Sequence, residues 1–569
     1  MIHAAASFRG PARHSIARAL YAPYLMTLVL IASGSFVIQA QVTFERLLRA
    51  DQEPQNWLTY SGNLSGQRYS PLTQITPGNV KNLELQWVFQ TRRPAEPAEK
   101  FEATPLVVDG IMYTVLAPNH VVALDAATGR MFWLFSPRIS QLARVCCGRV
   151  NRGLAIFGDT LFMGTIDGHL IAIDAKTGRP IWDVAVAKPE SGYSFTVAPL
   201  IVKNKVIVGP SGGEYGIRGF IAAFDAATGK EAWRFNTIPG PGEPGHETWT
   251  DKEAAAWKTG GGPAWVTGSY DPALNLVYWG TGNPGPDWNG DPRPGDNLYS
   301  DSVLALDPDT GKLKWHYQFT PHDEFDYDST QVPVLADITW QGRPTKVMLW
   351  ANRNGLWYVL DRTTGDFLSG KPFTKVNWMD GFDEKGRPKR VINPTTEGSL
   401  VYPNNQGATN WYPPSYSPRT GLFYIPTWAD TYSTYTKGPA EYKEGNQYVG
   451  RFPTMAFPAL ATGPGSINQR LPEEGYGAIQ AFDPQTGQRK WEFKMADVTD
   501  SGVLSTASDL VFAGGREGYF FALDARTGEQ LWKANVGGQV AAGPMSYSVN
   551  GKQYVAIAAG SALFVYALR

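Results

Sequence analysis

One recurring pattern constrains the fold of this chain more than any other feature of its sequence. Apolar residues lead into Ala-x-Asp-x-x-x-Gly-x-x-x-Trp, where x is any residue. The alternating apolar residues favour a strand, Asp and Gly favour a tight turn, and a second strand then presents the Trp. Six copies end at Trp133, Trp182, Trp233, Trp315, Trp491 and Trp532, and a degenerate seventh around Asp361 has Ser369 at the Trp position.

The repeats predict a β-propeller. Two further short apolar runs precede most copies, such as residues 104–108 and 111–115, which makes about four strands per repeat, as in a propeller blade. The last segment, residues 543–568, lacks the motif, and residues 85–89 can supply its outer strand. Closing the ring in this way removes exposed sheet edges. We therefore expect an all-β, eight-bladed propeller over residues 41–569, closed by N- and C-terminal strands, with Trp residues filling the gaps between blades.

Composition and charge narrow the possible functions. The chain is 43% hydrophobic and only 18% charged, with 60 Gly and 42 Pro, which is typical of a turn-rich β structure. Its net charge of −1 provides no basic field for nucleic acid, so we expect no nucleic-acid partner. None of the seven His lies in a metal-ligand pair, which gives no support to zinc chemistry.

The N-terminus has the features of an export signal. Arg9, Arg13 and Arg18 precede a largely apolar stretch at residues 20–38, and the segment ends at the small residue Ala40. The alternative is a retained membrane anchor. Such an anchor needs about 20 apolar residues, and a proline and a Ser-Gly-Ser run interrupt this stretch. We expect residues 1–40 to be a cleaved signal peptide and the mature protein to be periplasmic.

The two cysteines, Cys146 and Cys147, are adjacent in the chain. They can pair with each other in an oxidising compartment. Neighbouring Cα atoms are about 3.8 Å apart, whereas disulfides prefer roughly 4.4–6.8 Å. The bond would also close almost no chain, so it would add little stability. A disulfide here would therefore need a functional explanation, and two reduced cysteines are the alternative.

Three features together resemble a known family. The repeated Trp motif, the cysteine pair in CCGRVNRG and the acidic run TPHDEFDYD at residues 320–328 are similar to the PQQ-dependent methanol and ethanol dehydrogenases. The similarity extends over nearly the whole chain, from Asn56 to Leu568. The Trp motif alone is weak, because non-enzymatic propellers share it, but the other two are specific. The resemblance implies an exported quinoprotein that oxidises primary alcohols to aldehydes with pyrroloquinoline quinone (PQQ).

The resemblance also implies a cofactor-binding set. Cys146 and Cys147 would form a disulfide against one face of the PQQ ring, and Trp265 would form the floor against the other. Arg353 corresponds to the cation beside the reactive carbonyl. The remaining implied contacts are Glu102, Arg152, Thr196, Ser211, Gly212, Gly213 and Asn410.

A metal ion is implied beside the quinone. Its ligands by resemblance are Glu214, Asn283, Asp326 and Asp328, and Asp326 is also the expected catalytic base. Carboxylate and amide oxygens suit hard cations of high coordination number. Asp328 matches an extra carboxylate typical of the lanthanide-dependent branch. Two carboxylates at such distances repel by about 4 kcal/mol at an effective dielectric near 20, and a trivalent ion offsets this repulsion better than Ca²⁺. We expect one lanthanide ion, with Ca²⁺ as the alternative.

The sequence also bears on substrate and partners. The chain has no Cys-x-x-Cys-His haem motif, so electrons are expected to leave through a soluble cytochrome c. Pro263 stands where methanol-oxidising relatives commonly have Thr, and residues 498–502 lack a Trp seen in several relatives. These departures favour a small alcohol other than methanol as substrate. A homodimer is a further expectation.

Two other functions remain as alternatives. One is a non-catalytic propeller scaffold of the outer-membrane assembly lipoprotein type, which would need a cysteine near Ala40 that this chain lacks. The other is a PQQ dehydrogenase for a polyol or a sugar. Two long loops, residues 235–262 and 428–477, are expected to cover one mouth of the propeller, since loops of this length tend to be functional.

Overall fold

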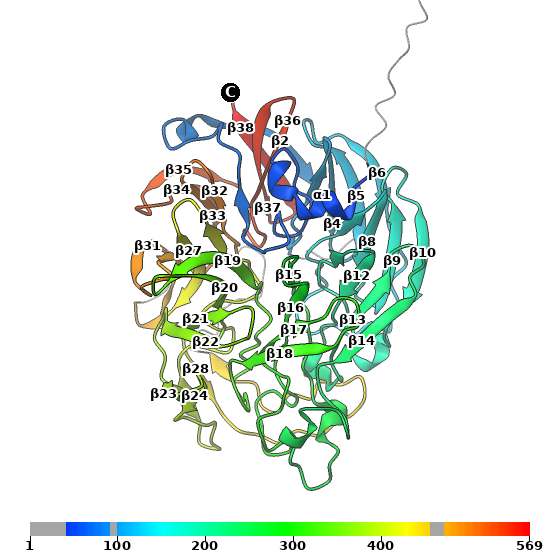
Figure 1. Ribbon diagram of the computed structural model, residues 1–569, viewed down its shortest axis with the longest axis vertical. Coiled ribbons are helices and arrows are strands. Elements are labelled where there is room, and N and C mark those ends of the chain that lie inside the picture. The colour runs from blue at the N-terminus through cyan, green and yellow to red at the C-terminus, as the bar shows by residue number, and fades with distance from the viewer. Residues whose placement is uncertain (1–40, 92–99, 456–471) are drawn as a thin grey trace, which may run out of the picture. The chain divides into compact units, whose positions relative to one another are not determined.

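Eight antiparallel sheets of four strands, one of them extended by a parallel fifth strand, make up the fold (Figure 1). The structure is a computed structural model, and it describes residues 41–91, 100–455 and 472–569. The predicted signal peptide, residues 1–40, lies outside the described residues. From Gln41 onwards the chain forms one compact unit. The prediction of an eight-bladed, all-β propeller is confirmed, and we number the blades 1 to 8 in chain order.

The first four blades follow the repeats directly. They comprise β3 (Leu106–Val108), β4 (Ile111–Leu116), β5 (His120–Asp125) and β6 (Met131–Phe135); β7 (Ala155–Phe157), β8 (Thr160–Gly164), β9 (His169–Asp174) and β10 (Pro180–Ala185); β11 (Leu200–Val202), β12 (Lys205–Val208), β13 (Phe220–Asp225) and β14 (Glu231–Asn236); and β15 (Ser269–Asp271), β16 (Leu276–Gly280), β17 (Ser302–Leu306) and β18 (Leu313–Gln318).

The remaining four blades complete the set. They comprise β19 (Val334–Trp340), β20 (Arg343–Ala351), β21 (Leu356–Asp361) and β22 (Phe367–Pro372); β26 (Ser415–Ser417), β27 (Leu422–Ala429), β30 (Tyr476–Phe482) and β31 (Arg489–Met495); β32 (Leu504–Thr506), β33 (Leu510–Gly514), β34 (Tyr519–Asp524) and β35 (Gln530–Asn535), extended by β1 (Tyr69–Ser70); and β36 (Met545–Val549), β37 (Lys552–Ala559), β38 (Ala562–Leu568) and β2 (Leu83–Gln90).

The N-terminal strand closes the ring, as the sequence predicts. β2 pairs antiparallel with β38, so the last blade takes its outer strand from the beginning of the chain. Trp87 on β2 packs against Gly129 in the turn of blade 1, where a Cβ atom would lie 2.6 Å from the indole ring. Trp87 therefore joins blade 8 to blade 1, although it lies outside the repeated motif.

The motif glycines are the docking points for the tryptophans of the preceding blades. A Cβ at Gly528, for example, would lie 2.7 Å from the Trp491 ring, and φ at this glycine is +75°. The indole of Trp491 also donates a hydrogen bond of 3.0 Å to the Ala525 carbonyl in the same turn. After the degenerate repeat with Ser369, the aliphatic part of Lys371 lies against Gly487 instead. Glycine is required at these turns by both the positive φ and the close ring.

Short elements outside the blades are few in the described part of the chain. Among the described residues, the single α-helix is α1 (Phe44–Leu48), and none of the helices there is long and apolar enough to cross a membrane. Additional strands are β23 (Met379–Phe382), β24 (Pro388–Arg390), β25 (Ser399–Val401), β28 (Ser433–Tyr435) and β29 (Thr454–Met455). The 3₁₀ helices are η1 (Ala50–Gln52), η2 (Val80–Asn82), η3 (Pro189–Ser191), η4 (Gly213–Tyr215), η5 (His246–Thr248), η6 (Ala256–Thr259) and η7 (Pro472–Glu474).

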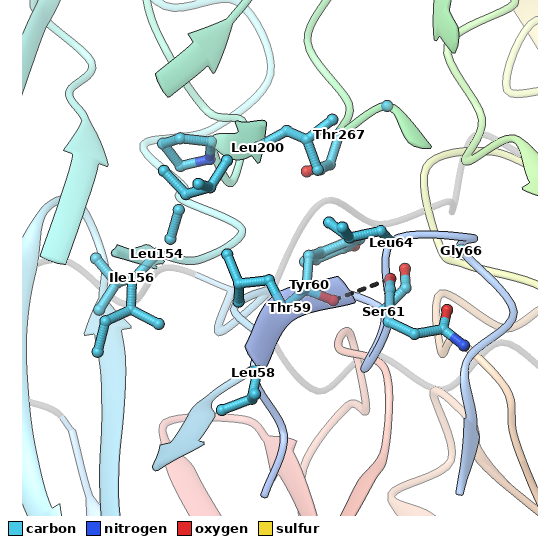
Figure 2. Close-up of a pocket in the computed structure, with 16 residues that line it drawn as sticks. Leu58, Thr59, Tyr60, Ser61, Leu64, Gly66, Leu154, Ile156, Leu200 and Thr267 are labelled. Atoms are coloured by element: carbon cyan, nitrogen blue, oxygen red, sulfur yellow. Dashed lines mark hydrogen bonds between the residues drawn. The ribbon is translucent and has the colours of Figure 1, made fainter. Parts of the chain in front are cut away.

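An apolar cluster joins segments that precede or follow the blades. Except for Trp428 on β27, its members lie in the N-terminal segment and in the segments that lead into blades 3 to 8: Tyr60, Ala198, Val266, Val332, Trp411, Tyr412, Trp428, Val498 and Ala541, with Trp265 against it. A cavity of about 20 Å³ lies beside Tyr60 and is lined by residues such as Leu58, Leu154 and Leu200 (Figure 2). It has room for about one water molecule, so it is too small to be a cofactor site.

Candidate functional site

The predicted site residues lie in two kinds of connection. One kind joins the outer strand of a blade to the inner strand of the next, and the other joins the second and third strands of a blade. In antiparallel sheets both kinds emerge at the same edge, so they gather at one face. The first kind carries Glu102, Cys146, Cys147, Arg152, Thr196, Trp265, Asp326, Asp328 and Asn410, and the second carries Ser211, Gly212, Gly213, Glu214, Asn283 and Arg353.

The guanidinium of Arg353 holds both predicted aspartates. Its Nη1 lies 2.6 Å from Asp328 Oδ2, and its Nη2 lies 3.2 Å from Asp326 Oδ2. Asp326 has a left-handed backbone, with φ at +61°, and the segment is not a strand. The two side chains therefore converge because of a turn, and not because alternate residues of an extended strand share a face.

Asp328 is held from three sides. Besides Arg353, the indole N–H of Trp265 donates to Asp328 Oδ2 at 3.2 Å, and the backbone N–H of Asn283 donates to Oδ1 at 2.8 Å. A Cβ at Gly282 would lie 2.1 Å from Asp328 Oδ1, so only glycine allows this approach. The Asp328 carboxylate thus contacts three residues of the expected site. They are Trp265, expected to be the floor under the quinone; Asn283, an expected metal ligand; and Arg353, expected beside the reactive carbonyl.

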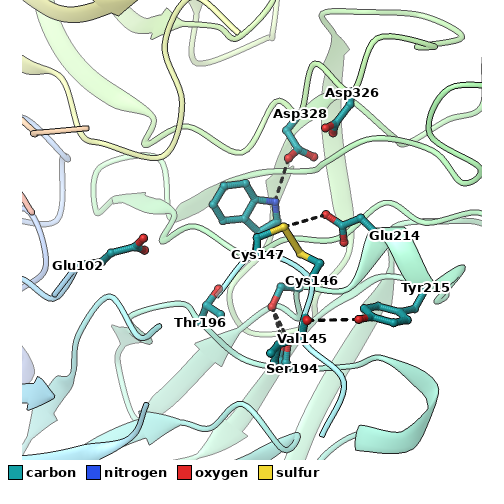
Figure 3. The surroundings of a disulfide bond; sticks show 12 residues. Glu102, Val145, Cys146, Cys147, Ser194, Thr196, Glu214, Tyr215, Asp326 and Asp328 are labelled. Atoms are coloured by element: carbon teal, nitrogen blue, oxygen red, sulfur yellow. Dashed lines mark hydrogen bonds between the residues drawn. A yellow bond between two sulfur atoms is a disulfide. The ribbon is translucent and has the colours of Figure 1, made fainter. Parts of the chain in front are cut away.

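Glu214 lies beside the cysteine pair. Cys146 and Cys147 form a disulfide, and Cys147 Sγ is 3.5 Å from Glu214 Oε1. In Figure 3 the disulfide lies between Glu102 on one side and Glu214, Asp326 and Asp328 on the other. The disulfide expected from the family resemblance is therefore present, and it lies next to an expected metal ligand.

Burial dominates the electrostatics of these carboxylates. It raises the pKa of Glu214 to about 7, and the charge of Asp328 adds to the effect. Burial also raises the pKa of Asp326 and of Asp328, while Arg353 opposes the rise in both. Desolvation and mutual repulsion disfavour negative charge here. A bound cation would therefore stabilise the site by offsetting this repulsion.

The acidic run is shaped by its own hydrogen bonds. Asp323 accepts from the backbone N–H groups of Phe325 and Tyr327, at 2.9 and 2.8 Å. Arg390 pairs with Glu324 at 2.7 Å. His322 Nδ1 lies 2.8 Å from the Gly295 carbonyl. These contacts fix the turn that presents Asp326.

The other end of the site is built around Arg152. Its guanidinium lies 2.9 Å from Glu102 Oε2 and donates to Thr196 Oγ1 at 2.8 Å. It also lies 4.7 Å from the ring centroids of both Trp265 and Trp411. Trp411, the neighbour of the predicted cofactor contact Asn410, thus packs its ring against Arg152.

Other predicted cofactor contacts are also engaged within the protein. Ser211 Oγ lies 2.8 Å from Ser194 Oγ, and a Cβ at Gly213 would lie 3.1 Å from Asn283 Oδ1. Gly212 has φ at +118°, which suits glycine at this tight turn. Asn410 donates to the Gln406 carbonyl at 2.9 Å. The cofactor contacts of these residues stay predictions.

The second long loop covers part of this face. The backbone N–H of Tyr448 donates to the Glu214 carbonyl at 2.6 Å, and the Trp288 N–H donates to the Val449 carbonyl at 2.9 Å. Residues 456–471 of the loop lie outside the described residues. In the stretch that lacks the relatives' Trp, Asp500 lies instead, paired with Arg516 and Lys100 at 3.1 and 3.2 Å.

Two buried aspartates near the site were not singled out from the sequence. Asp287 lies within the loop that carries Asn283, Asp301 ends this loop, and both are fully buried. Burial raises the pKa of each, and nearby carboxylates, including those of Asp326 and Asp328, raise it further. No sequence signal distinguishes them, because an Asp among Gly and Pro is ordinarily a turn residue.

The residues fit the cofactor and metal that the resemblance implies. Glu214, Asn283, Asp326 and Asp328 offer oxygen donors. Asp328 is buried, Glu214 and Asp326 are partly buried, and all three carboxyl groups have raised pKa values. Arg152 and Arg353 offer guanidinium groups for the carboxylates and carbonyls of a quinone. The chemistry of these donors is that of a site for a hard cation beside an anionic, planar ligand.

Comparisons with known proteins agree with this geometry. The family model described as "PQQ: Glucose/ethanol/alcohol dehydrogenase, beta-propeller domain" matches residues 57–377 and 494–555. The quinohemoprotein alcohol dehydrogenase ADH IIB of Pseudomonas putida is 41% identical over 94% of this chain and 78% of its own length. The lanthanide-dependent methanol dehydrogenase of Methylacidiphilum fumariolicum is 38% identical over 91% of this chain and 86% of its own length. A solved europium-containing methanol dehydrogenase superposes with a TM-score of 0.85 at 35% identity, covering 92% of this chain and 100% of that structure.

Proposed function

Because the chain belongs to the family of PQQ-dependent alcohol dehydrogenases, we propose that it oxidises primary alcohols to aldehydes with a lanthanide ion beside the quinone. The observation that carries the metal assignment is the pair Asp326 and Asp328, both held on Arg353. We further propose that the protein works in the periplasm after cleavage of residues 1–40. The electron acceptor is a soluble cytochrome c.

The chain's own residues divide the chemistry between them. PQQ, when bound, supplies the two-electron acceptor, and the metal ion supplies a Lewis acid beside it. Asp326 takes the hydroxyl proton of the alcohol, since its carboxylate lies beside Arg353 and keeps a partly exposed side chain that an alcohol can reach. Arg353 offers the positive charge that stabilises a developing oxyanion. The disulfide and Trp265 are the rigid surfaces that hold a planar ring and exclude water.

Arg152 anchors the opposite end of the quinone, and its replacement by methionine should weaken PQQ binding. Arg152→Met removes one member of the buried ion pair between Arg152 and Glu102, a change that costs about 3–5 kcal/mol. We expect PQQ affinity to fall about a hundredfold or more, as measured by titration of the apoprotein. Unchanged affinity would remove Arg152 from the cofactor site. The double variant Glu102→Gln/Arg152→Met controls for the uncompensated charge.

The metal assignment is tested with the apoprotein. Reconstitution with PQQ plus La³⁺ should support higher alcohol oxidation than PQQ plus Ca²⁺, because the clustered carboxylates favour the ion of higher charge. Equal or better activity with Ca²⁺ would contradict the lanthanide proposal and leave the membership of the family untouched. A panel of primary alcohols, polyols and sugars in the same assay tests the proposed substrate class.

The names of relatives support the proposed partners. The 1-butanol dehydrogenase (cytochrome c) of Thauera butanivorans is 39% identical over 89% of this chain and 74% of its own length. Reduction of an added cytochrome c, at a rate that follows alcohol oxidation, tests the acceptor. The family membership gives no support to the scaffold alternative.

A further inference from the structure

Asp287 and Asp301 are buried carboxylates without a local structural role. Both residues are 0% exposed. Within the described residues 41–91, 100–455 and 472–569, no protein group hydrogen-bonds either oxygen of either side chain. Burial of an unsatisfied carboxylate is costly, and natural folds retain such a group where it serves a function.

Their position relates both residues to the metal ligand Asn283. This ligand follows β16, and Asp287 comes four residues later in the same loop. Asp301 ends the loop, directly before β17, and its backbone N–H donates to the Gly282 carbonyl at 3.1 Å. The charges of Asp326 and Asp328 act on both carboxyl groups, and that of Glu214 acts on Asp287. The two acids therefore lie behind the expected ligands.

The arginine of this loop does not neutralise them through an ion pair. Arg293 is fully buried, and it donates to the backbone carbonyls of Pro286, Asp287 and Asp323 and to Asn297 Oδ1. Its donors are thus directed at neutral oxygens, and its positive charge opposes the raised pKa of Asp287 and Asp301 without a direct contact.

The other guanidinium groups nearby already have carboxylate partners. Arg353 pairs with Asp326 and Asp328, and Arg390 pairs with Glu324. The carboxylates of this region therefore outnumber its cationic side chains. The carboxylates are those of Glu214, Asp287, Asp301, Asp323, Glu324, Asp326 and Asp328. The cationic side chains are those of Arg293, Arg353, Arg390 and Lys437.

We propose that Asp287 and Asp301 form an outer ring of buried negative charge that selects a trivalent cation without coordinating it. This inference rests on the proposed function, and it assigns metal selectivity to more than the extra ligand Asp328. The electrostatic energy of a cation in a fixed field is proportional to the charge of the cation. Each buried carboxylate therefore attracts a trivalent ion one and a half times as strongly as a divalent ion. Low local dielectric makes the effect large at a distance.

The test measures metal binding by Asp287→Asn and Asp301→Asn. Tb³⁺ binding to the PQQ-loaded protein is followed by its luminescence, sensitised by Trp265, which hydrogen-bonds to Asp328. Ca²⁺ binding is followed by competition with Tb³⁺. If each substitution weakens Ca²⁺ binding about tenfold, charge proportionality predicts that Tb³⁺ binding weakens about thirtyfold. Asp291→Asn is the matched control, because Asp291 lies in the same loop with its side chain 69% exposed, and it should leave both affinities unchanged.

The melting temperature of the apoprotein gives a second readout, which should not fall in the variants although their metal binding weakens. Without the metal, the raised pKa values favour the neutral acids, so replacing them with neutral asparagine should leave the melting temperature of the apo variants unchanged or raised. If the carboxylates were structural, the substitutions would lower the melting temperature and leave the ratio of Tb³⁺ affinity to Ca²⁺ affinity unchanged. That result, or failure of both variants to fold, would overturn the inference.

The outcomes separate this inference from the function on which it rests. If the unaltered protein binds Tb³⁺ more weakly than Ca²⁺, the lanthanide proposal itself is wrong. If the unaltered protein prefers Tb³⁺ and both variants keep that preference in full, the ligands alone select the metal and the outer ring has no role. A loss of preference in both variants, with Asp291→Asn unchanged, supports the outer ring.

Discussion

Replacing Asp326 with asparagine is expected to abolish turnover with either metal. Asparagine keeps the size of the side chain and one oxygen donor, but it cannot accept the alcohol's proton at a carboxylate. General-base catalysis contributes about a hundredfold to ten-thousandfold, so kcat should fall about a thousandfold. Steady-state rates of the variant reconstituted with PQQ and La³⁺, and with PQQ and Ca²⁺, measure the loss.

Binding controls show whether this loss is chemical. Arg353 binds both Asp326 and Asp328. Its Nη1 contact with Asp328, 2.6 Å long, remains in the variant. We therefore expect PQQ affinity to change by less than about tenfold, and the melting temperature of the apoprotein to be maintained, because a buried charge has been removed. Retained kcat in a correctly loaded variant would exclude Asp326 as the base.

Replacing Asp328 with alanine is expected to shift the metal preference towards Ca²⁺. The loss of one carboxylate should lower lanthanide-supported kcat/KM by about a hundredfold and Ca²⁺-supported kcat/KM by about twentyfold, since the lost attraction is proportional to ion charge. The structure adds a second consequence. Asp328 also binds Trp265 and the Asn283 backbone, so PQQ affinity should fall as well, by about tenfold.

A conservative variant separates charge from shape at this position. Asp328→Asn retains an oxygen that can accept from the Asn283 N–H, but it removes the negative charge. If charge selects the metal, Asn and Ala should lose lanthanide-supported activity alike, while Asn binds PQQ better than Ala does. Equal losses with both metals in both variants would contradict a role for Asp328 in metal choice.

The repeats predicted the architecture because the same local physics recurs in each blade. A turn with a positive-φ glycine admits the ring of a tryptophan from the preceding blade, and the motif contains both partners. Trp87 could not be recognised as a member of this set, because its strand joins blade 8 from the other end of the chain. Its docking against Gly129 is a tertiary contact that no local pattern encodes.

The candidate site was predicted in its residues more fully than in its geometry. The acidic run and the cysteine pair are recognisable in the sequence, but the turn that brings Asp326 and Asp328 together is not. The structure has Asp326 in a left-handed conformation, stabilised by the hydrogen bonds of Asp323. Asp287 and Asp301 could not be found from the sequence, because their significance depends on complete burial and on the carboxylates around them.

The pairing of β2 with β38 has a consequence for how the protein reaches its native state. β38 lies between β2 and β37 in the last blade, so blade 8 cannot be completed until the final residues of the chain are available. The contact that joins the ends has nearly the largest sequence separation in the molecule. Bringing such distant segments together is the slow, entropically opposed step of folding. Seven blades can form as the chain emerges, and the eighth then converts an open arc with two unpaired ends into a continuous ring.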